Sequence, residues 1–301
     1  MELIRPGTRI DFIGYRKYAY LVSGILIGIS LISIFFWRGL SFGIDFSGGL
    51  ELQVAFSARV TTEDLRKALT SIGFKDARIQ SVGSAQGSEF LIRLLKISDN
   101  PKESELSKIQ NTLFTTFGKN KVDIRRAEVV GSEVSKDLKQ KGFLASFYAC
   151  IGLLIYIWWR FEFSFSIGAI LSLVHDITLT VGIFSLTGRE ISLTVIAALL
   201  TLLGYSLNDT IVVFDRIREN MKKQTGSYDL AGLMSDSVSQ TLSRTILTSL
   251  TVFIVVLCLY FMGGEVINGF AFAMLIGVIT GTYSSIYIAS PFVLLVHKEK
   301  K

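Results

Sequence analysis

Six long apolar segments recur along the chain, separated by polar stretches. Each approaches or exceeds the roughly 20 helical residues needed to cross a hydrocarbon layer about 30 Å thick. The first follows basic residues, as a signal peptide would, but it is too long and ends at Trp37 and Arg38 rather than at a small-residue cleavage site. The pattern therefore predicts six membrane-spanning helices, at residues 18–37, 142–160, 163–186, 191–214, 245–262 and 268–296.

The basic residues predict the orientation of these helices, because short cytoplasmic segments are enriched in Lys and Arg. If the N-terminus is inside, the two short outer loops hold only Arg189. The cytoplasmic side would then comprise the tails 1–17 and 297–301 and the connection 215–244. The basic residues of the short inner segments are Arg5, Arg9, Arg16, Lys17, Arg160, Arg216, Arg218, Lys222, Lys223, Arg244, Lys298, Lys300 and Lys301. We expect both termini inside and residues 38–141 outside the cytoplasm.

Within residues 38–141 the hydrophobic period changes from that of spanning helices to that of a small α+β domain. Alternating apolar residues predict strands, whereas apolar residues three or four apart predict helices, the first with Thr62 as its N-cap. The expected elements are strands at 50–56, 77–82, 90–95 and 122–130 and helices at 61–72 and 103–117. The order β-α-β-β-α-β is that of a ferredoxin-like sandwich. Since the domain contains no His or Cys, we expect it to bind or to couple mechanically rather than to catalyse.

The polar connection 215–244 contains a second helical pattern. Leu230, Leu233, Met234 and Val238 recur at helical spacing among Ser, Asp and Gln. The pattern favours an amphipathic helix at the cytoplasmic membrane surface over a docking site for a soluble partner.

Composition supports the membrane prediction and excludes several functions. Of the 301 residues, 50% are hydrophobic and only 19% are charged, compared with about a quarter in soluble domains. The net charge of +6 does not predict nucleic-acid binding, because the basic residues lie at the ends of apolar segments. Cys150 and Cys258 fall inside such segments and are expected to be small buried hydrophobes. We find no phosphate-binding loop and no metal-ligand cluster, so an ion gradient is the expected energy source and no cofactor is expected.

Ionisable or strongly polar residues interrupt the apolar segments at three places. They are His175 and Asp176 in the third segment, Asn208 and Asp209 in the fourth, and Arg244 at the entry to the fifth. Such residues are costly in lipid and indicate function by default. A carboxylate, a histidine and an arginine are the groups that a proton relay needs.

Structural roles remain open for these residues, since Asn and His also form hydrogen bonds between helices. Function is favoured for the carboxylates, whereas Arg244 alone would be expected to reach the membrane surface. The polar positions form one stripe on each helix, and we expect the two stripes to face each other. They comprise Ser172, His175, Asp176 and Thr180 on one helix and Thr201, Tyr205, Asn208 and Asp209 on the other.

Three segments give the chain a resemblance to a known family. Residues 43–49 read GIDFSGG, residues 204–220 read GYSLNDTIVVFDRIREN, and residues 240–245 read QTLSRT. They resemble the signatures of the SecD/SecF family, within the resistance-nodulation-division superfamily of transporters, as does the His175-Asp176 pair. The residues that match these motifs include Gly43, Asp45, Gly48, Gly49, Asp215 and Arg216. Residues 130–135 depart from the family pattern, because they lack a Pro and a second Gly.

The resemblance implies a function and a set of partners. A member of this family would be a non-enzymatic subunit of the bacterial inner membrane that assists export of unfolded precursors with SecD, the SecYEG channel and the SecA motor. Proton flow would drive it, with Asp209 as the protonated carboxylate and Arg244 as its basic partner; Asp176 and His175 are weaker candidates for the same path. The alternatives are a half-size proton-coupled exporter of small molecules or lipids and a passive assembly scaffold.

Overall fold

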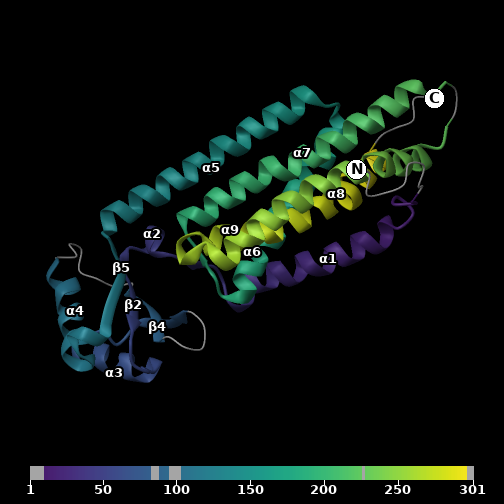
Figure 1. The fold of residues 1–301 in the computed structure, drawn as a ribbon. Coiled ribbons are helices and arrows are strands. Elements are labelled where there is room, and N and C mark those ends of the chain that lie inside the picture. The colour runs from purple at the N-terminus through teal and green to yellow at the C-terminus, as the bar shows by residue number, and fades with distance from the viewer. Residues whose placement is uncertain (1–9, 83–87, 95–102, 226–227, 297–301) are drawn as a thin grey trace. The chain divides into compact units, whose positions relative to one another are not determined.

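The computed structural model describes residues 10–82, 88–94, 103–225 and 228–296. The chain forms two compact units, one helical and one α+β (Figure 1). The α+β unit extends from Phe42 to Phe143, and the helical unit contains the segments before and after it. The predicted terminal tails lie largely outside the described residues.

The described part of the chain contains six helices that are long and apolar enough to cross a membrane. The multi-pass architecture is therefore as predicted. The first and last spans each contain a π-helical stretch, which marks a local irregularity in the backbone hydrogen bonding. The spans are α1 (Arg16–Ile32) with η1 (Ser33–Trp37), α5 (Ser132–Arg160), α6 (Phe163–Thr187), α7 (Leu193–Lys223), α8 (Leu230–Met262), and α9 (Gly264–Ser284) with η3 (Ser285–Ala289) and α10 (Ser290–Val296).

Helices α7 and α8 are longer than the hydrophobic pattern predicts. Most of residues 215–244 belong to these two helices instead of forming a separate connection. The Asp229 side chain caps the start of α8 by accepting hydrogen bonds from the backbone N–H groups of Ala231 and Gly232, both at 3.1 Å. The apolar residues of the expected surface helix, from Leu230 to Val238, are buried in the helical core. The amphipathic pattern therefore faces protein rather than a membrane surface.

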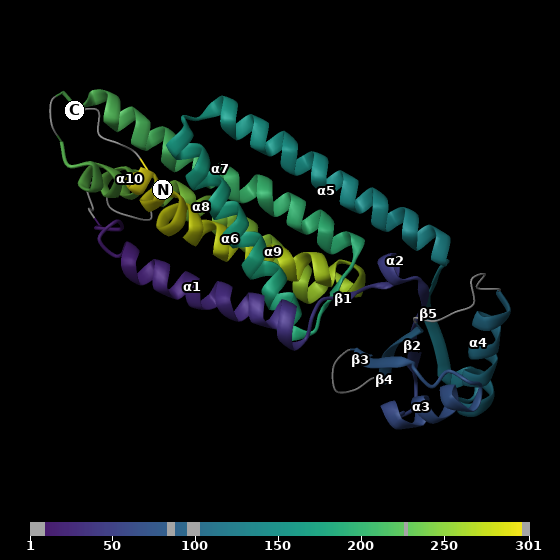
Figure 2. The same ribbon diagram turned by 180° about the vertical axis from the view of Figure 1, so that it is seen from behind.

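The core of the helical unit is built mainly from α6, α7, α8 and the last span. Phe214 on α7 is fully buried and makes edge-to-face contacts with Phe161 and Phe165, at centroid distances of 5.6 and 5.0 Å. Phe12 and Ile13, which precede α1, join the same cluster. Helices α1 and α5 lie at opposite edges of the unit, which Figure 2 shows from behind.

The α+β unit has the predicted ferredoxin-like topology. Its strands pair antiparallel in the order β3-β4-β2-β5. Alternate residues of β2, from Leu50 to Phe56, are buried against the two longer helices, as the alternation predicted. The elements of this unit are α2 (Ile44–Ser47), β2 (Gly49–Phe56), α3 (Thr62–Ser71), β3 (Arg78–Val82), β4 (Ser88–Leu94), α4 (Glu103–Phe117), η2 (Lys119–Lys121) and β5 (Val122–Val130). Two strands of two residues each, β1 (Ser41–Phe42) and β6 (Glu190–Ile191), are not part of this sheet.

One predicted helix start is shifted by a residue. The N-cap of α3 is Thr61 rather than Thr62, because its hydroxyl accepts a hydrogen bond from the Asp64 backbone N–H at 3.2 Å. The Asp64 carboxylate in turn accepts from the Thr61 N–H at 3.1 Å, which completes a capping box. Because Asp64 lies three residues after Thr61, Thr61 rather than Thr62 is the N-cap.

Candidate proton-coupling site

Asp209 lies in the middle part of α7, enclosed by three helices. Only 2% of the residue is exposed. Its Oδ2 atom accepts a hydrogen bond from Ser249 Oγ on α8 at 3.3 Å, and Ser249 Oγ lies 2.7 Å from Thr282 Oγ1 on α9. Thr245, one helical turn before Ser249, contributes a buried hydroxyl that has no hydrogen-bond partner among the described residues. Asp209 is thus a buried carboxylate with one hydroxyl donor among the described residues, Ser249, which in turn contacts Thr282.

Two predicted partners of Asp209 are placed away from its carboxylate. Asn208 is exposed on the surface of the helical unit, on the same side of α7 as Thr201 and Gly204. Arg244 is also exposed, and these two described side chains, Arg244 and Asp209, form no ion pair within 4.0 Å. The roles assigned to Asn208 and Arg244 therefore remain predictions.

His175 and Asp176 form a second buried cluster, on α6. Their residues are 3% and 1% exposed, and His175 Nδ1 lies 2.9 Å from Asp176 Oδ1. Asp176 Oδ2 accepts hydrogen bonds from Ser206 Oγ on α7 at 2.6 Å and from Ser284 Oγ on α9 at 2.8 Å. On the other side, His175 Nε2 lies 3.2 Å from Ser23 Oγ on α1.

The two predicted polar stripes do not face each other as expected. The α6 stripe meets α1, α7 and α9 through Ser23, Ser206 and Ser284, none of which was singled out in the sequence. One signal for Ser206 was available, because it lies three residues before Asp209 and therefore near it on the helix surface. Ser23 and Ser284 carried no such signal, because isolated serines are common in membrane helices.

The glycines of the first motif fix the chain around the short helix α2. Gly43 precedes α2, Asp45 lies in its first turn, and Gly48 follows it with φ of +68°. Gly49 has φ of +136°. A Cβ atom on Gly48 would lie 3.3 Å from Ser135 Oγ and 3.4 Å from the Val130 carbonyl oxygen. The left-handed backbone and the close approach together require glycine at position 48.

The charged residues of the second motif join α7 to its neighbours. Asp215 accepts a hydrogen bond from Arg160 Nη2 on α5 at 2.6 Å. Arg216 Nε donates to Gln240 Oε1 on α8 at 2.6 Å, and Asn220 Nδ2 donates to the same oxygen at 3.0 Å. These residues thus hold helices together rather than surrounding Asp209.

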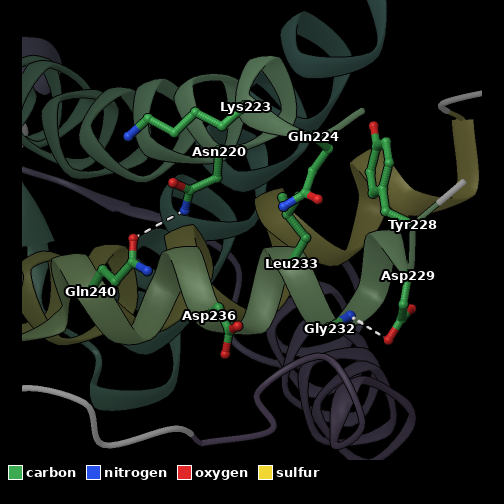
Figure 3. Close-up of a pocket in the computed structure, with 9 residues that line it drawn as sticks. All are labelled: Asn220, Lys223, Gln224, Tyr228, Asp229, Gly232, Leu233, Asp236 and Gln240. Carbon is green, nitrogen blue, oxygen red and sulfur yellow. Dashed lines mark hydrogen bonds between the residues drawn. The ribbon is translucent and has the colours of Figure 1, made fainter. Parts of the chain in front are cut away.

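A surface pocket of about 400 Å³ lies where the end of α7 meets the start of α8 (Figure 3). Asn220, Gln240, Lys223, Asp229 and Asp236 are among its polar lining residues. Within the described residues, no three His, Cys, Asp or Glu side chains are grouped as metal ligands. The buried carboxylates within the spans are therefore the strongest candidate site.

Six apolar helices and buried carboxylates define a multi-pass membrane protein of the transporter type. The sequence matches the family described as "Protein export membrane protein SecD/SecF, C-terminal" over residues 109–299, and the "SecD/SecF GG Motif" over residues 34–58. The chain belongs to the SecD/SecF family.

Two relatives match this chain along nearly their whole length. "Protein translocase subunit SecF" of Calditerrivibrio nitroreducens is 49% identical over 303 residues, which cover 100% of this chain and 98% of that protein. The subunit of the same name from Vibrio alginolyticus is 41% identical, covering 100% and 94%. Both relatives are named as transport components.

A solved structure extends the comparison to the fold. The crystal structure of SecDF, a translocon-associated membrane protein from Thermus thermophilus, superposes with a TM-score of 0.83 at 35% identity. The match covers 96% of this chain but only 39% of the SecDF chain. This chain therefore spans less than half the length of that protein.

Proposed function

We propose that this chain is the SecF-like subunit of a bacterial protein-export machine that uses the proton gradient. It would act with a SecD partner to promote the late-stage movement of unfolded precursors through a SecYEG channel, with SecA as the motor. The names of the relatives support the export role, and the greater length of the SecDF chain supports a second half.

The observation that carries the proposal is the burial of Asp209. A carboxylate in a membrane-spanning helix is costly and is retained where it serves an ion pathway. Asp209 accepts one hydrogen bond from a neighbouring serine, at 3.3 Å, and it contacts no cation of the described residues within ion-pair distance. Protonation and deprotonation of this carboxylate would alter how α7 packs against α8 and α9.

Arg244 is the basic group proposed to balance the charge of Asp209 in another conformation. It lies on α8, five residues before Ser249, which bonds Asp209. At 1.5 Å per residue, a shift of α8 along α7 by about 7.5 Å, somewhat more than one turn, would bring Arg244 to the level of the carboxylate. Sliding of one helix past another by one turn, about 5.4 Å, is a known form of switching transition.

The proposed orientation places both termini in the cytoplasm. Support comes from the segment before α1, which contacts the start of α8: the Ile10 and Ile13 N–H groups donate to Ser239 Oγ and Ser235 Oγ, each at 3.2 Å. The end of α7, which is hydrogen-bonded to the start of α8 through Asn220 and Ser237, contains basic residues of the predicted cytoplasmic side, namely Arg216, Arg218, Lys222 and Lys223. The described N-terminal segment and this basic region thus lie at one end of the helical unit (Figure 1).

The test is gradient-driven export of a stalled precursor in vesicles that contain SecYEG, SecA and SecD together with this chain. Asp209→Asn preserves size and hydrogen bonding but cannot cycle a proton. We expect export to lose its dependence on the gradient while the complex still assembles. Glu63→Gln, which neutralises an exposed carboxylate on α3, is the matched control and should behave as wild type.

The same vesicles distinguish the alternative functions. Gradient-dependent export that survives in Asp209→Asn would contradict the coupling role of Asp209 and leave the ion path to Asp176 or to the partner subunit. Photo-crosslinking from residues 50–130 to the stalled precursor separates protein export from small-molecule pumping. A precursor that never crosslinks to this domain would contradict direct action on the exported chain.

A further inference from the structure

The His175–Asp176 cluster is linked to four spans, and its hydrogen bonds determine how many protons it holds. Tyr283 Oη donates its only hydrogen to the Ala19 carbonyl oxygen at 2.9 Å, because a carbonyl can only accept. Ser23 Oγ, 3.0 Å from Tyr283 Oη, must then be the donor in that contact. Ser23 has no further hydrogen, so it accepts from His175 Nε2. Nε2 therefore carries a hydrogen.

The opposite side of the cluster fixes the remaining hydrogen. Ser206 and Ser284 both donate to Asp176 Oδ2, which leaves Oδ1 to face His175 Nδ1 at 2.9 Å. A contact this short between two potential acceptors needs one hydrogen between them. The pair therefore holds two hydrogens in total, either as imidazolium with carboxylate or as neutral imidazole with carboxylic acid. In both forms the pair is neutral overall.

Removal of the shared proton leaves the chain of contacts one hydrogen short. If that proton passes to water, the imidazole keeps its remaining hydrogen on Nδ1, against Asp176, and Nε2 becomes an acceptor. Ser23 then donates to Nε2, and its contact with Tyr283 has no hydrogen unless Tyr283 releases the Ala19 carbonyl. Either way α1 loses one of its two part-buried hydrogen bonds to Tyr283 on α9.

The cluster is joined to the Asp209 site through two helices. Ser206 and Asp209 are three residues apart on α7, and Thr282 and Ser284 flank Tyr283 on α9. Thr282 bonds the serine that donates to Asp209, whereas Ser284 bonds Asp176. The π-helical η3 begins directly after Ser284, and π-helical turns are frequent at functional sites. Movement of α7 or α9 at one carboxylate therefore reaches the other.

We propose that the His175–Asp176 pair is a second proton-binding site, distinct from Asp209, whose shared proton completes the hydrogen bonds that lock α1 to α9. Release of that proton removes one of these bonds and loosens α1, which leads in sequence to the α+β unit. The use of this lock in transport rests on the proposed function, whereas the hydrogen positions do not. Asp209 would then exchange the driving proton, and the pair would control the first span.

Few other titratable groups near α6 could be confused with the His175–Asp176 pair in a pH titration. Phenols keep their protons up to about pH 10, so over the range from about pH 5 to 9 the remaining group to control for is Asp209. Apart from Tyr18 and the charged residues at the span ends, the titratable side chains on the elements packed against α6 are Tyr20 on α1, Tyr205 and Asp209 on α7, Tyr283 on α9 and Tyr287 on η3. Tyr283 also stacks on the His175 ring, at a centroid distance of 5.9 Å.

Nitrogen-15 NMR of histidine-labelled full-length protein tests the hydrogen positions. The chain has two histidines, so His297→Gln leaves His175 as the single signal. We expect a hydrogen on Nε2 at about pH 7. Asp176→Asn, whose amide donates to Nδ1, should fix the neutral Nε2–H form across the range, and Asp209→Asn should leave the His175 signal unchanged. A bare Nε2 in the wild type would overturn the proposal.

A second readout follows the lock itself. Ser33 Oγ on η1 lies 2.8 Å from Ser185 Oγ on α6, so a Ser33→Cys, Ser185→Cys pair, without Cys150 and Cys258, reports separation of the first span. In export vesicles, a proton gradient should lower the yield of this crosslink when the cysteine pair is otherwise unsubstituted. With Asp176→Asn added, the yield should stay the same. Gradient-driven export should fall by about fivefold or more. Export equal to wild type in Asp176→Asn, or a crosslink that the gradient lowers in Asp176→Asn as much as in the otherwise unsubstituted pair, would overturn the lock, whatever Asp209→Asn shows. Unchanged export in Asp209→Asn alone would overturn only the proposed carrier.

Discussion

At the scale of single residues, Gly182 controls how closely the first span packs. A Cβ atom placed on Gly182 of α6 would lie 2.2 Å from the Cβ of Ser30 on α1, far inside van der Waals contact. Gly182→Ala should therefore push α1 away and destabilise the protein by about 1–3 kcal/mol, the usual range for overpacking. The measurement is the thermal unfolding temperature in detergent.

Gly152 provides the matched control for this substitution. It lies within a membrane-spanning helix, α5, and a Cβ atom there would meet nothing within 4 Å. Gly152→Ala should leave the unfolding temperature unchanged or slightly raised, because alanine favours helix. Equal effects of the two alanines would show that α1 and α6 do not approach as described.

The capping box of α3 makes a pH-dependent prediction. Hydrogen bonds from the side chain and backbone of Thr61 lower the pKa of the exposed Asp64 carboxyl. Because the folded-state pKa is depressed, the stabilisation is present above the unfolded-state value, about 3.9, and is lost as pH falls through the folded-state value. Thr61→Ala should return the Asp64 pKa toward its ordinary range and weaken the start of α3 by about 1 kcal/mol. Carbon-13 NMR titration of the carboxyl and hydrogen exchange in α3 measure the two effects.

The neighbouring threonine tests whether the cap has been assigned to the right residue. Thr62 is the first residue of α3, and the described cap hydrogen bonds come from Thr61. Thr62→Ala should leave the Asp64 pKa unchanged. A return of the pKa in the Thr62 variant instead would restore the sequence-based choice of N-cap.

Sequence reasoning identified the buried ionisable residues but not most of their partners. Asp176 and Asp209 stand out because carboxylates are rare in apolar segments. Their partners are hydroxyls, which are common in spans and usually bond the backbone of their own helix, as Thr180 does with the Asp176 carbonyl at 2.7 Å. Only the fold distinguishes Ser249 and Ser284 from such serines and threonines. The outward position of Asn208 likewise depends on helix rotation.

At the scale of elements, Gln240 joins the first half of α8 to the end of α7. Its side-chain oxygen accepts hydrogen bonds from both Arg216 and Asn220 on α7. Gln240→Ala removes an acceptor that two partly exposed donors share and should loosen the first half of α8, at a cost of about 1 kcal/mol. Hydrogen exchange should increase in residues 230–243 and remain unchanged in residues 250–262.

Gln240→Glu separates the loss of the acceptor from the loss of packing. A carboxylate keeps an oxygen for Arg216 and Asn220 and adds an ionic contribution with the guanidinium. This variant should exchange as slowly as wild type. Rapid exchange in both variants would indicate that the shape of the glutamine, rather than its oxygen, holds α7 and α8 together.

The elements of the α+β unit were predictable because each has a clear period and clear ends. Alternation along β2 and the stop at Gly118 after α4 placed these elements within a residue or two. The continuity of α8 from the polar residues 230–244 into the apolar span was not predictable from hydropathy. Its sequence changes from polar to apolar near Arg244, but the backbone hydrogen bonds of a helix continue across such a change when no breaker intervenes. The fold class thus followed from periodicity, whereas this boundary depended on packing against α7.

At the scale of the whole molecule, the polar face of α7 indicates an incomplete assembly. Thr201, Gly204 and Asn208 lie at helical spacing within a span, and all three are exposed in the isolated chain. Lipid offers no hydrogen bond to the Asn208 amide, so a polar group there needs a protein neighbour. A small residue between two polar ones also permits close approach of another helix. This face is therefore the expected contact with the SecD partner.

A bulky residue on this face should block assembly. A Cβ atom placed on Gly204 would meet nothing within 4 Å, so Gly204→Trp fits the isolated chain but would occupy the space of a partner helix. We expect much less SecD to copurify with this variant, while its unfolding temperature without SecD stays close to wild type. Gly24→Trp on α1, which also has open space around it, controls for an added tryptophan in a span. Copurification reduced equally by both variants, or by neither, would contradict the assignment of the α7 face.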